Sequence, residues 1–358
     1  MKQAGIVTFF DHPNYGAVLQ AYGLQQALEQ LGCSVTFIRN RREPEPAARE
    51  SDRRERVLEA LRHRQDALRP FRKPFADFCE KAFRTDEADG RQAFDTEYDF
   101  FLVGSDQVWN VEITGRDPFW FLDFAPPEKR FSYAASFGLD RLPENCLSWY
   151  RDMLAGFTHL SVREPSGQRI IRELTGIEAA VCPDPVLLPE RRVWEDLMVP
   201  AEKTVLLYMT ETDAELYRYA KADAAERGLP LTVSSSTMLP FTGEGRILSP
   251  EEWLGAVANA AVVYTNSFHA LVFSQLFHTE IRIRPMTGMK NRNGRLFSFI
   301  DSMGEILAKE ETRPGLFRVE DSGEAGYWEK TDKQLQEFRR SGLRYLLETL
   351  ELPGDGMP

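Results

Sequence analysis

The sequence predicts an α/β fold in two halves of similar size, each of which alternates strands with helices. The first half opens with an apolar strand over 4–10, a helix that ends near Gly32 and a strand over 34–39. The second half repeats the alternation from a strand over 204–210 onward. Strand–helix–strand units with short links are typical of parallel sheets. We therefore expect two Rossmann-like domains that face each other across a cleft.

Further strands are expected in the first half wherever an apolar run precedes a polar loop. The sequence indicates them in four places: 98–104, 130–138, 157–164 and 179–188. A helix follows the third of these strands, around SGQRIIREL. Because buried strands of a parallel sheet are apolar on both faces, these runs fit a continuation of the first sheet.

In the second half, a helix is expected over 213–228, and Gly228 is suited to end it. A capping box is predicted where Ser249 and Glu252 flank Pro250 at the start of the next helix. The segment after it, AVVYTNS, reads as a strand, and FHALVFSQLF reads as the helix that follows. EIRIR is then a strand, GRLFSFIDSM a helix, and the region from Lys330 to Leu350 a long amphipathic helix.

These elements define the expected domains. The N-terminal Rossmann-like domain covers 1–190 and the C-terminal one covers 191–325, while a helix within 326–358 packs back across both. The Arg-rich segment over 41–95 interrupts the first domain. It is interpreted as a solvated helical insertion because its opposite charges are interspersed. The alternative, a basic arm that binds an acceptor or contacts a membrane, stays open.

The composition excludes some classes of partner. Hydrophobic residues make up 42% and charged residues 28% of 358 residues, as in a soluble globular protein of two domains. The net charge is −11, which argues against nucleic acid as a partner, since phosphate backbones bind to basic surfaces. A small anionic ligand needs only a local cationic pocket and is not excluded.

The first residues and the cysteines indicate a cytoplasmic location. The apolar run in MKQAGIVTFFDHPN is shorter than a secretory signal needs, and no apolar segment is long enough to span a bilayer. The four cysteines are far apart and form no CxxC pair: Cys33, Cys79, Cys146 and Cys182. We expect them to be free thiols without metal or disulfide roles.

Ligands of open α/β sheets bind at the carboxyl ends of the strands, so the residues that follow each strand are the candidate site. After the first strand, Asn14 and Gly16 precede a helix whose first N–H groups could hold an anion. The alternative is an ordinary turn, because a GxGxxG pattern is absent. Arg163 follows another strand, where its guanidinium could grip a carboxylate or phosphate or form a surface ion pair.

A dense polar and aromatic set, GSDQVWN, follows the strand over 98–104. Asp106 could accept hydrogen bonds from sugar hydroxyls and Trp109 could stack on a pyranose, although Ser105 or Asp106 could also be a plain N-cap. His269 lies in the first turn of its helix, with Ser267 as the expected N-cap. A neutral imidazole at a helix N-terminus can act as a base, but a structural histidine is equally compatible with the pattern.

The segment beyond His269 is rich in positive charge. It contains Arg282, Arg284, Lys290, Arg292 and Arg295. In a chain of net charge −11, this local excess favours an anionic ligand, and the alternative is interspersed surface charge.

These pieces, in this order, resemble the polysaccharide pyruvyl transferase family. The resemblance rests on NYGAVLQAYGLQQAL, YDFFLVGSDQVWN, FSYAASFG, SVRE, CPDPVLL, TNSFHALVFSQLF and the Lys290-x-x-Asn293-x-Arg295 stretch. It runs from about residue 4 to 305 and skips the charged insertion. The resemblance implies a fold like that of the GT-B glycosyltransferases. It also implies an enzyme that moves the pyruvyl group of phosphoenolpyruvate onto two hydroxyls of a sugar in a bacterial polysaccharide or cell-surface glycan precursor.

The resemblance also implies roles for individual residues. His269 would be the catalytic proton carrier, assisted by Asp106. The expected donor-binding residues are Arg163, Asn14, Gly16, Ser267, Lys290 and Arg295. The expected acceptor-binding residues are Gln107, Trp109, Asn110 and Ser136. The resemblance implies no metal and no cofactor. Phosphoenolpyruvate enters the reaction as a co-substrate. A lipid-linked acceptor would bring the protein to the membrane surface, and this alternative stays open.

One departure bears on the donor. Many family members have an arginine two residues before the histidine, where this chain has Ser267. A neighbouring cation would have to replace it for phosphoenolpyruvate to bind. Two other functions are therefore kept: a nucleotide-sugar glycosyltransferase of the same fold, and a non-catalytic protein of a polysaccharide cluster. The paired glutamates seven residues apart that many such glycosyltransferases carry are not found at a strand–helix junction here.

Overall fold

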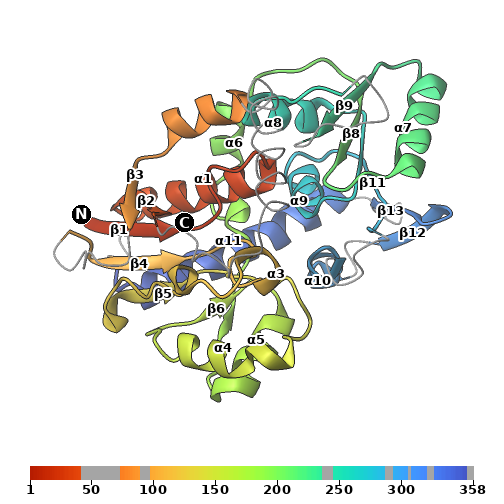
Figure 1. The fold of residues 1–358 in the computed structure, drawn as a ribbon. Helices are drawn as coiled ribbons and strands as arrows, with labels where there is room; N and C mark the ends of the chain where they lie inside the picture. Colours follow the sequence, from red (N-terminus) through yellow and green to blue (C-terminus); the bar gives the residue numbers. More distant parts are fainter. Residues whose placement is uncertain are drawn as a thin grey trace, which may run out of the picture.

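Two sheets, each flanked by helices, form the framework of the protein (Figure 1). The computed structural model describes residues 1–41, 73–88, 97–235, 245–286, 293–304, 308–320 and 326–352. Most of the charged insertion lies outside the described residues, and so does Lys290. The two sheets confirm the predicted α/β class with two Rossmann-like halves in a GT-B-like arrangement.

The first sheet has five parallel strands in the order β3-β2-β1-β4-β5, the order of a Rossmann half with the first strand at its centre. Their bounds are Thr85–Ala88, Cys33–Asn40, Lys2–Val7, Phe100–Val103 and Arg130–Ser132. Two short strands, β6 (Ser161–Val162) and β7 (Ala180–Val181), pair beside it and reach it through single bridges. The strands predicted over 130–138 and 157–164 are therefore shorter than expected.

The second sheet has the order β12-β13-β11-β10-β8-β9. Its bounds are Ala308–Arg313, Leu316–Glu320, Ile281–Ile283, Val262–Thr265, Val205–Met209 and Leu231–Ser235. The last four are parallel, as expected, while β12 and β13 add an antiparallel hairpin at one edge. The hairpin was not predicted, because AKEETR has no alternation of apolar and polar residues.

Helices cover both sheets, and several begin where the sequence predicts. The longer ones are α1 (Tyr15–Gln30), α4 (Leu147–Leu154), α5 (Pro165–Thr175), α6 (Arg191–Leu197), α7 (Ala214–Arg227), α8 (Pro250–Asn259), α9 (Phe268–Leu276), α10 (Gly294–Ser302) and α11 (Tyr327–Thr349). The capping box is confirmed, since Ser249 and Glu252 exchange side-chain and backbone hydrogen bonds at the start of α8. Gly228 ends α7 in the left-handed conformation.

The two halves share buried contacts. Tyr15, at the start of α1, is fully buried, and its ring stacks on Trp253 of α8 at 4.9 Å. Its hydroxyl accepts a hydrogen bond from the Leu248 N–H at 2.9 Å and donates to the Leu248 carbonyl at 3.0 Å. One hydrophobic core therefore runs from the first sheet into the second.

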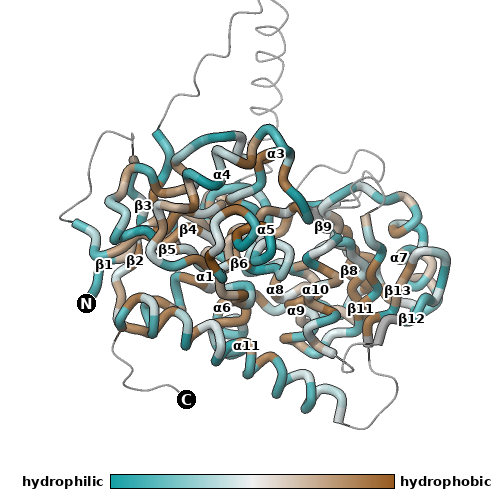
Figure 2. Tube along the Cα trace, turned by 90° about the horizontal axis from the view of Figure 1, so that it is seen from below, coloured by the Kyte–Doolittle hydropathy of each residue, from teal (hydrophilic) through white to brown (hydrophobic). Residues whose placement is uncertain are grey.

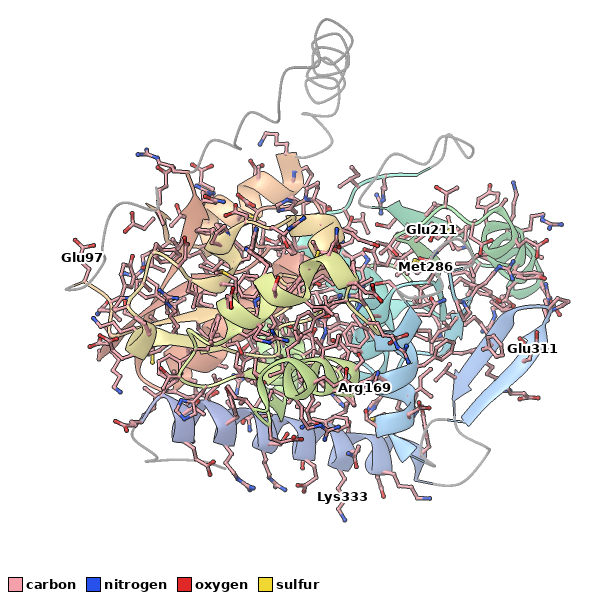
Figure 3. The ribbon with its side chains drawn as sticks, turned by 60° about the horizontal axis from the view of Figure 1, so that its bottom comes forward. Glu97, Arg169, Glu211, Met286, Glu311 and Lys333 are labelled. Atoms are coloured by element: carbon pink, nitrogen blue, oxygen red, sulfur yellow. The ribbon has the colours of Figure 1, made fainter. Side chains whose placement is uncertain are left out.

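The last helix, α11, runs along one side of the molecule beneath both halves (Figures 2 and 3). Tyr327 donates to Gln275 of the second half at 2.8 Å. Arg339 and Tyr345 donate to the backbone carbonyls of Leu188 and Ser132 in the first half. Neither α11 nor any other helix of the described segments combines the length and the apolar character needed to span a bilayer.

Candidate active site

A cleft of about 410 Å³ opens where the carboxyl ends of strands from both sheets meet. It is lined by residues that follow β1, β4, β8, β10 and β11. Six residues predicted from the sequence are among them: Asn14, Asp106, Gln107, Ser267, His269 and Arg295. Parallel strands point their carboxyl ends to one edge of the sheet, which is why residues so distant in sequence meet here.

His269 is held at the start of α9. The side chain of Ser267 caps this helix, as predicted, by accepting from the Ala270 N–H, and Ser267 in turn donates its own N–H to Thr265 Oγ1 at 2.9 Å. The side chain of His269 is only 8% exposed. The first turn of α1 packs against the ring so closely that a Cβ on Gly16 would overlap Nδ1. The absence of a side chain at Gly16 therefore lets the N-terminus of α1 reach the histidine.

Asp184 lies beside the imidazole of His269. Its Oδ2 stands 3.3 Å from His269 Nε2 and accepts a hydrogen bond from Arg163 Nη1 at 2.6 Å. Asp184 Oδ1 accepts from the N–H of Val186. Burial alone would raise the pKa of this carboxyl, but the charges of His269 and Arg163 and its hydrogen bonds hold the pKa well below its usual range. Asp184 is therefore a fixed negative charge that orients both neighbours.

Arg163 is buried just after β6 and has carboxylates on several sides. Besides Asp184, it pairs with Glu164 at 2.9 Å and lies 3.6 Å from Asp106. Burial opposes its charge, but these three carboxylates raise the pKa of Arg163 above its ordinary value. The guanidinium also lies 5.2 Å from the ring centroid of Phe268. Arg163 is thus a permanent cation held rigidly in the site.

A second arginine approaches from the other half of the molecule. Arg295, on α10, lies 3.4 Å from Asp106 Oδ1, so Asp106 stands between two guanidinium groups. Burial and the nearby charge of Arg163 lower the pKa of Arg295. An anion placed between the two arginines would relieve their mutual repulsion.

Three buried nitrogens around this cluster form no hydrogen bond: Arg163 Nη2, Arg295 Nε and His269 Nε2. A buried donor without an acceptor costs free energy, so each of these nitrogens can gain from an acceptor that a ligand supplies. They come from both halves of the molecule: Arg163 and Arg295 flank Asp106, and His269 lies beside Asp184. The arrangement is therefore suited to an anionic ligand that brings several acceptor oxygens into the space between the halves.

The sequence matches the model of one known protein family. The family model described as polysaccharide pyruvyl transferase matches residues 14–280, which is most of the chain. The chain belongs to the polysaccharide pyruvyl transferase family. A search among curated proteins found no match.

Solved structures of other proteins cover the chain with little sequence identity. The UDP-GlcNAc 2-epimerase from Neisseria meningitidis, bound to UDP-GlcNAc, is 10% identical and has a TM-score of 0.47, covering 98% of this chain and 100% of its own. An alpha-glucosyltransferase in complex with UDP and a 13-mer DNA is 6% identical and has a TM-score of 0.45, covering 98% and 99%. A UDP-GlcNAc 2-epimerase from Methanocaldococcus jannaschii is 11% identical, with a TM-score of 0.37 and coverages of 78% and 83%.

Some residues that we predicted for the acceptor lie away from the cleft in this family member. The ring of Trp109 is fully buried, stacks on Phe121 at 5.6 Å and donates from Nε1 to the Trp120 carbonyl. The expected stacking of Trp109 on a sugar therefore does not fit this structure. Asn110 and Ser136 are also fully buried.

The hydrogen bonds of these two residues are internal. Asn110 caps a short helix, α3 (Val111–Thr114), and donates to Gln107 Oε1 at 2.8 Å. Ser136 donates to Glu164 Oε1 and accepts from the Gly138 N–H. Both residues support the loops that carry Asp106 and Arg163, and of the four residues predicted for the acceptor only Gln107 lines the cleft.

Two other cations of the predicted basic segment, Arg282 and Arg284, lie outside the cleft. Arg282 pairs with Glu280, and Arg284 pairs with Asp213 and Glu215. Both are thus engaged on the second sheet, and Arg295 is the one described member of the basic segment that reaches the cleft. Arg295 therefore lines the cleft together with Ser267.

Sequence reasoning missed Asp184 and Glu164. Asp184 is fully buried and accepts a hydrogen bond from Arg163. It lies within CPDPVLL, which contributes to the family resemblance but supplied no predicted site residue. Applying the strand-end rule to the strand that ends at Val181 would have pointed to it, since an acidic residue follows within three positions. Glu164 was not predicted as part of the site; it is buried and pairs with Arg163, which is also buried.

Proposed function

We propose that the protein transfers the pyruvyl group of phosphoenolpyruvate onto two hydroxyls of a sugar in a glycan precursor, forming a cyclic ketal and releasing phosphate. The observation that carries the proposal is that three buried nitrogens without a hydrogen bond, Arg163 Nη2, Arg295 Nε and His269 Nε2, lie around one small space. Phosphoenolpyruvate carries a carboxylate and a phosphate on the same carbon, so its oxygens can accept from all three groups at once.

The reaction needs proton transfers as well as charge stabilisation. The methylene carbon of the donor gains a proton and becomes a methyl group, and the neighbouring carbon becomes electrophilic. Two sugar hydroxyls add to that carbon and lose their protons, while the bond to the phosphate oxygen breaks. Three protons move: one is given to the methylene carbon, and each of the two sugar hydroxyls loses one. One of the hydroxyl protons leaves with phosphate, and the other replaces the proton given to carbon.

Each charged residue has a separate part in this scheme. His269 carries the proton, because an imidazole can donate and accept at neutral pH. Asp184 stabilises the imidazolium form from 3.3 Å and is a positioning residue. Arg163 and Arg295 hold the donor and offset the charge that develops on phosphate. Asp106 lies between the two arginines, where its carboxylate offsets their mutual repulsion, and it assists His269.

The N-termini of α1 and α9 add to the positive potential of the cleft. Asn14 caps α1 and Ser267 caps α9, and both residues line the cleft. Partial positive charge at a helix N-terminus favours anions by a fraction of a kcal/mol to about 1 kcal/mol each. These two helices compensate in part for the positive side chain that Ser267 lacks.

Binding of the donor tests the proposal first. Phosphoenolpyruvate should raise the melting temperature of the wild type, and Arg163→Gln should abolish that rise. Arg172→Gln serves as the control, because Arg172 lies exposed on α5 and pairs with Glu178. A shift with one nucleotide sugar and none with phosphoenolpyruvate would instead favour a glycosyltransferase.

Turnover tests the proton carrier. With phosphoenolpyruvate and glycan acceptors, the wild type should release phosphate, and His269→Gln should lower kcat by at least about 100-fold, the usual scale for loss of a general acid–base group. Unchanged phosphate release in His269→Gln would exclude the catalytic role of His269. Donor binding without any turnover would point to a non-catalytic family member.

A further inference from the structure

A second and larger cavity, of about 730 Å³, lies on the other side of the charged cluster. Arg163 and Asp184 form its inner end, and Phe268 and Arg295 border both this cavity and the cleft. Its volume is in the range of pockets that enclose a small molecule of several rings. The cavity therefore provides space for a second substrate directly beside the groups assigned to the donor.

The walls of this cavity combine aromatic rings with polar groups. Phe268, Phe297 and Phe338 are half-buried, come from α9, α10 and α11, and turn part of their surface to the cavity. Ser166, Ser298, Ser302 and Ser341 add hydroxyls around it. Aromatic faces pack on the C–H face of a sugar ring, while hydroxyls and carboxylates satisfy its hydroxyl groups. This mixture is suited to a carbohydrate.

Unpaired charges lie at the outer part of the cavity. Arg169 extends from α5 beside α10 (Figure 3), is exposed, and forms no ion pair within the segments that the structure describes. Asp140 and Asp301 also line the cavity without an ion pair to a described residue. The carboxylates can accept hydrogen bonds from sugar hydroxyls, whereas Arg169 needs an acceptor and prefers an anion.

Arg163 adds a second cation at the inner end of the same cavity. Its side chain lines the cavity and is only 4% exposed, and its Nη2 forms no hydrogen bond and lies 3.6 Å from Asp106 Oδ1. The N-terminus of α5 lies between Arg163 and Arg169, and its N-cap residue Glu164 supplies no side-chain cap. Arg163 is offset by its own carboxylates, so the α5 N-terminus and Arg169 are the groups on this wall that can take an anion.

We infer that this cavity binds the acceptor, and that the acceptor is a glycan with an anionic group, carboxylate or phosphate, on a sugar next to the one that reacts. The inference rests on the proposed function, because the reacting sugar is assigned to the end where Arg295 and Phe268 meet the donor cleft. The adjacent sugar packs on the phenylalanines, and its anionic group pairs with Arg169. This replaces the acceptor site predicted around Trp109, whose ring is buried.

Three matched disaccharides test the inference: cellobiose, cellobiouronic acid, in which a carboxylate replaces the terminal hydroxymethyl group, and cellobiose 6′-phosphate. Calorimetric titration should show at least one of the two anionic disaccharides binding the wild type about fivefold more tightly than cellobiose, the scale of one partly shielded ion pair. Arg169→Ala should remove this preference. Arg172→Ala, one turn further along α5 and paired with Glu178, should keep it.

A second variant locates the binding. Ser298→Trp would place an indole in the cavity from α10, and all three disaccharides should then bind at least about tenfold more weakly. Equal affinity of the wild type for neutral and anionic disaccharides, or a preference that survives Arg169→Ala, would overturn the inference. The more tightly bound of the two anionic disaccharides identifies the carboxylate or the phosphate as the group recognised.

The donor is tested separately, so the two ideas fail in different ways. Phosphoenolpyruvate is titrated into the wild type alone. If it does not bind while the Arg169-dependent preference is found, the proposed donor is wrong and the glycan cavity stands. If it binds and the preference is absent, the proposed function stands and the cavity assignment is wrong.

Discussion

Gly16 lies so close to His269 that a methyl group at this position would overlap the imidazole at Nδ1. We predict that Gly16→Ala lowers the free energy of unfolding by about 1–3 kcal/mol, because an extra carbon in a packed site forces side chains or backbone to move. It should also lower phosphate release, since the ring must leave its position beside Asp184. Urea unfolding and the turnover assay measure the two effects.

The double variant Gly16→Ala/His269→Ala is the control for this prediction. Without the ring there is nothing for the new methyl group to overlap, so the destabilisation by Gly16→Ala should shrink by about 1 kcal/mol or more on the His269→Ala background. Equal destabilisation on both backgrounds would show that the cost arises elsewhere in α1.

Single residues also show where the sequence was informative. Asp106, Arg163 and His269 each follow a strand, so the strand-end rule placed them at one edge without any knowledge of contacts. Trp109 follows the same strand as Asp106, but its ring turns into the core of the first half. The direction of a side chain in a loop depends on packing with distant residues such as Phe121, and periodicity carries no information about it.

At the scale of elements, local signals predicted helix ends better than strand lengths. Caps act over three or four residues, so the sequence around Ser249 contains all the atoms of the capping box. The length of β5 depends instead on its neighbour β4 and on where the chain leaves the ladder, and these are tertiary properties. The hairpin of β12 and β13 is held at the sheet edge by pairing with β11, which is likewise not local.

The capping box supports a testable prediction about α8. Ser249→Ala removes the acceptor for the Glu252 N–H and should lower the free energy of unfolding by about 1 kcal/mol. Ser249→Asp should restore most of that loss, because aspartate is an equally good N-cap. Chemical denaturation of the three proteins measures the effect. A Ser249→Asp variant as unstable as Ser249→Ala would indicate that the hydroxyl has a role other than capping.

At the scale of the whole molecule, the two halves are joined by buried contacts at two separate places. Tyr15 reaches from α1 into the second half, and α11 returns from the second half to the first. The sequence could indicate an amphipathic last helix from its periodicity, but it could not indicate the partner surface. The partners of Tyr15, Trp253 and Leu248, are more than 230 residues away in the chain, and no local pattern identifies such a pair.

Tyr15→Phe should weaken this joint, because the N–H and carbonyl of Leu248 lose their partner. We expect a loss of about 1–3 kcal/mol in the free energy of unfolding at pH 8. Tyr22→Phe is the matched control on the same helix, since the Tyr22 hydroxyl forms no hydrogen bond with the described residues. Equal losses in the two variants would show that the hydrogen bonds of Tyr15 are not responsible.

The same variant has a pH dependence of known sign. Burial raises the pKa of Tyr15 to about 12, whereas a tyrosine in an unfolded chain has a pKa of about 10. Between these values the unfolded chain releases the proton and the folded chain retains it, so the stabilisation by Tyr15 is complete below pH 10 and is lost as the pH rises toward 12.

Phenylalanine cannot ionise. The stability difference between wild type and Tyr15→Phe should therefore narrow by about 1 kcal/mol from pH 9.5 to pH 11, as measured by urea unfolding at each pH. A difference that stays constant over this range would mean that the Tyr15 hydroxyl is not shielded from solvent in the joint between the halves.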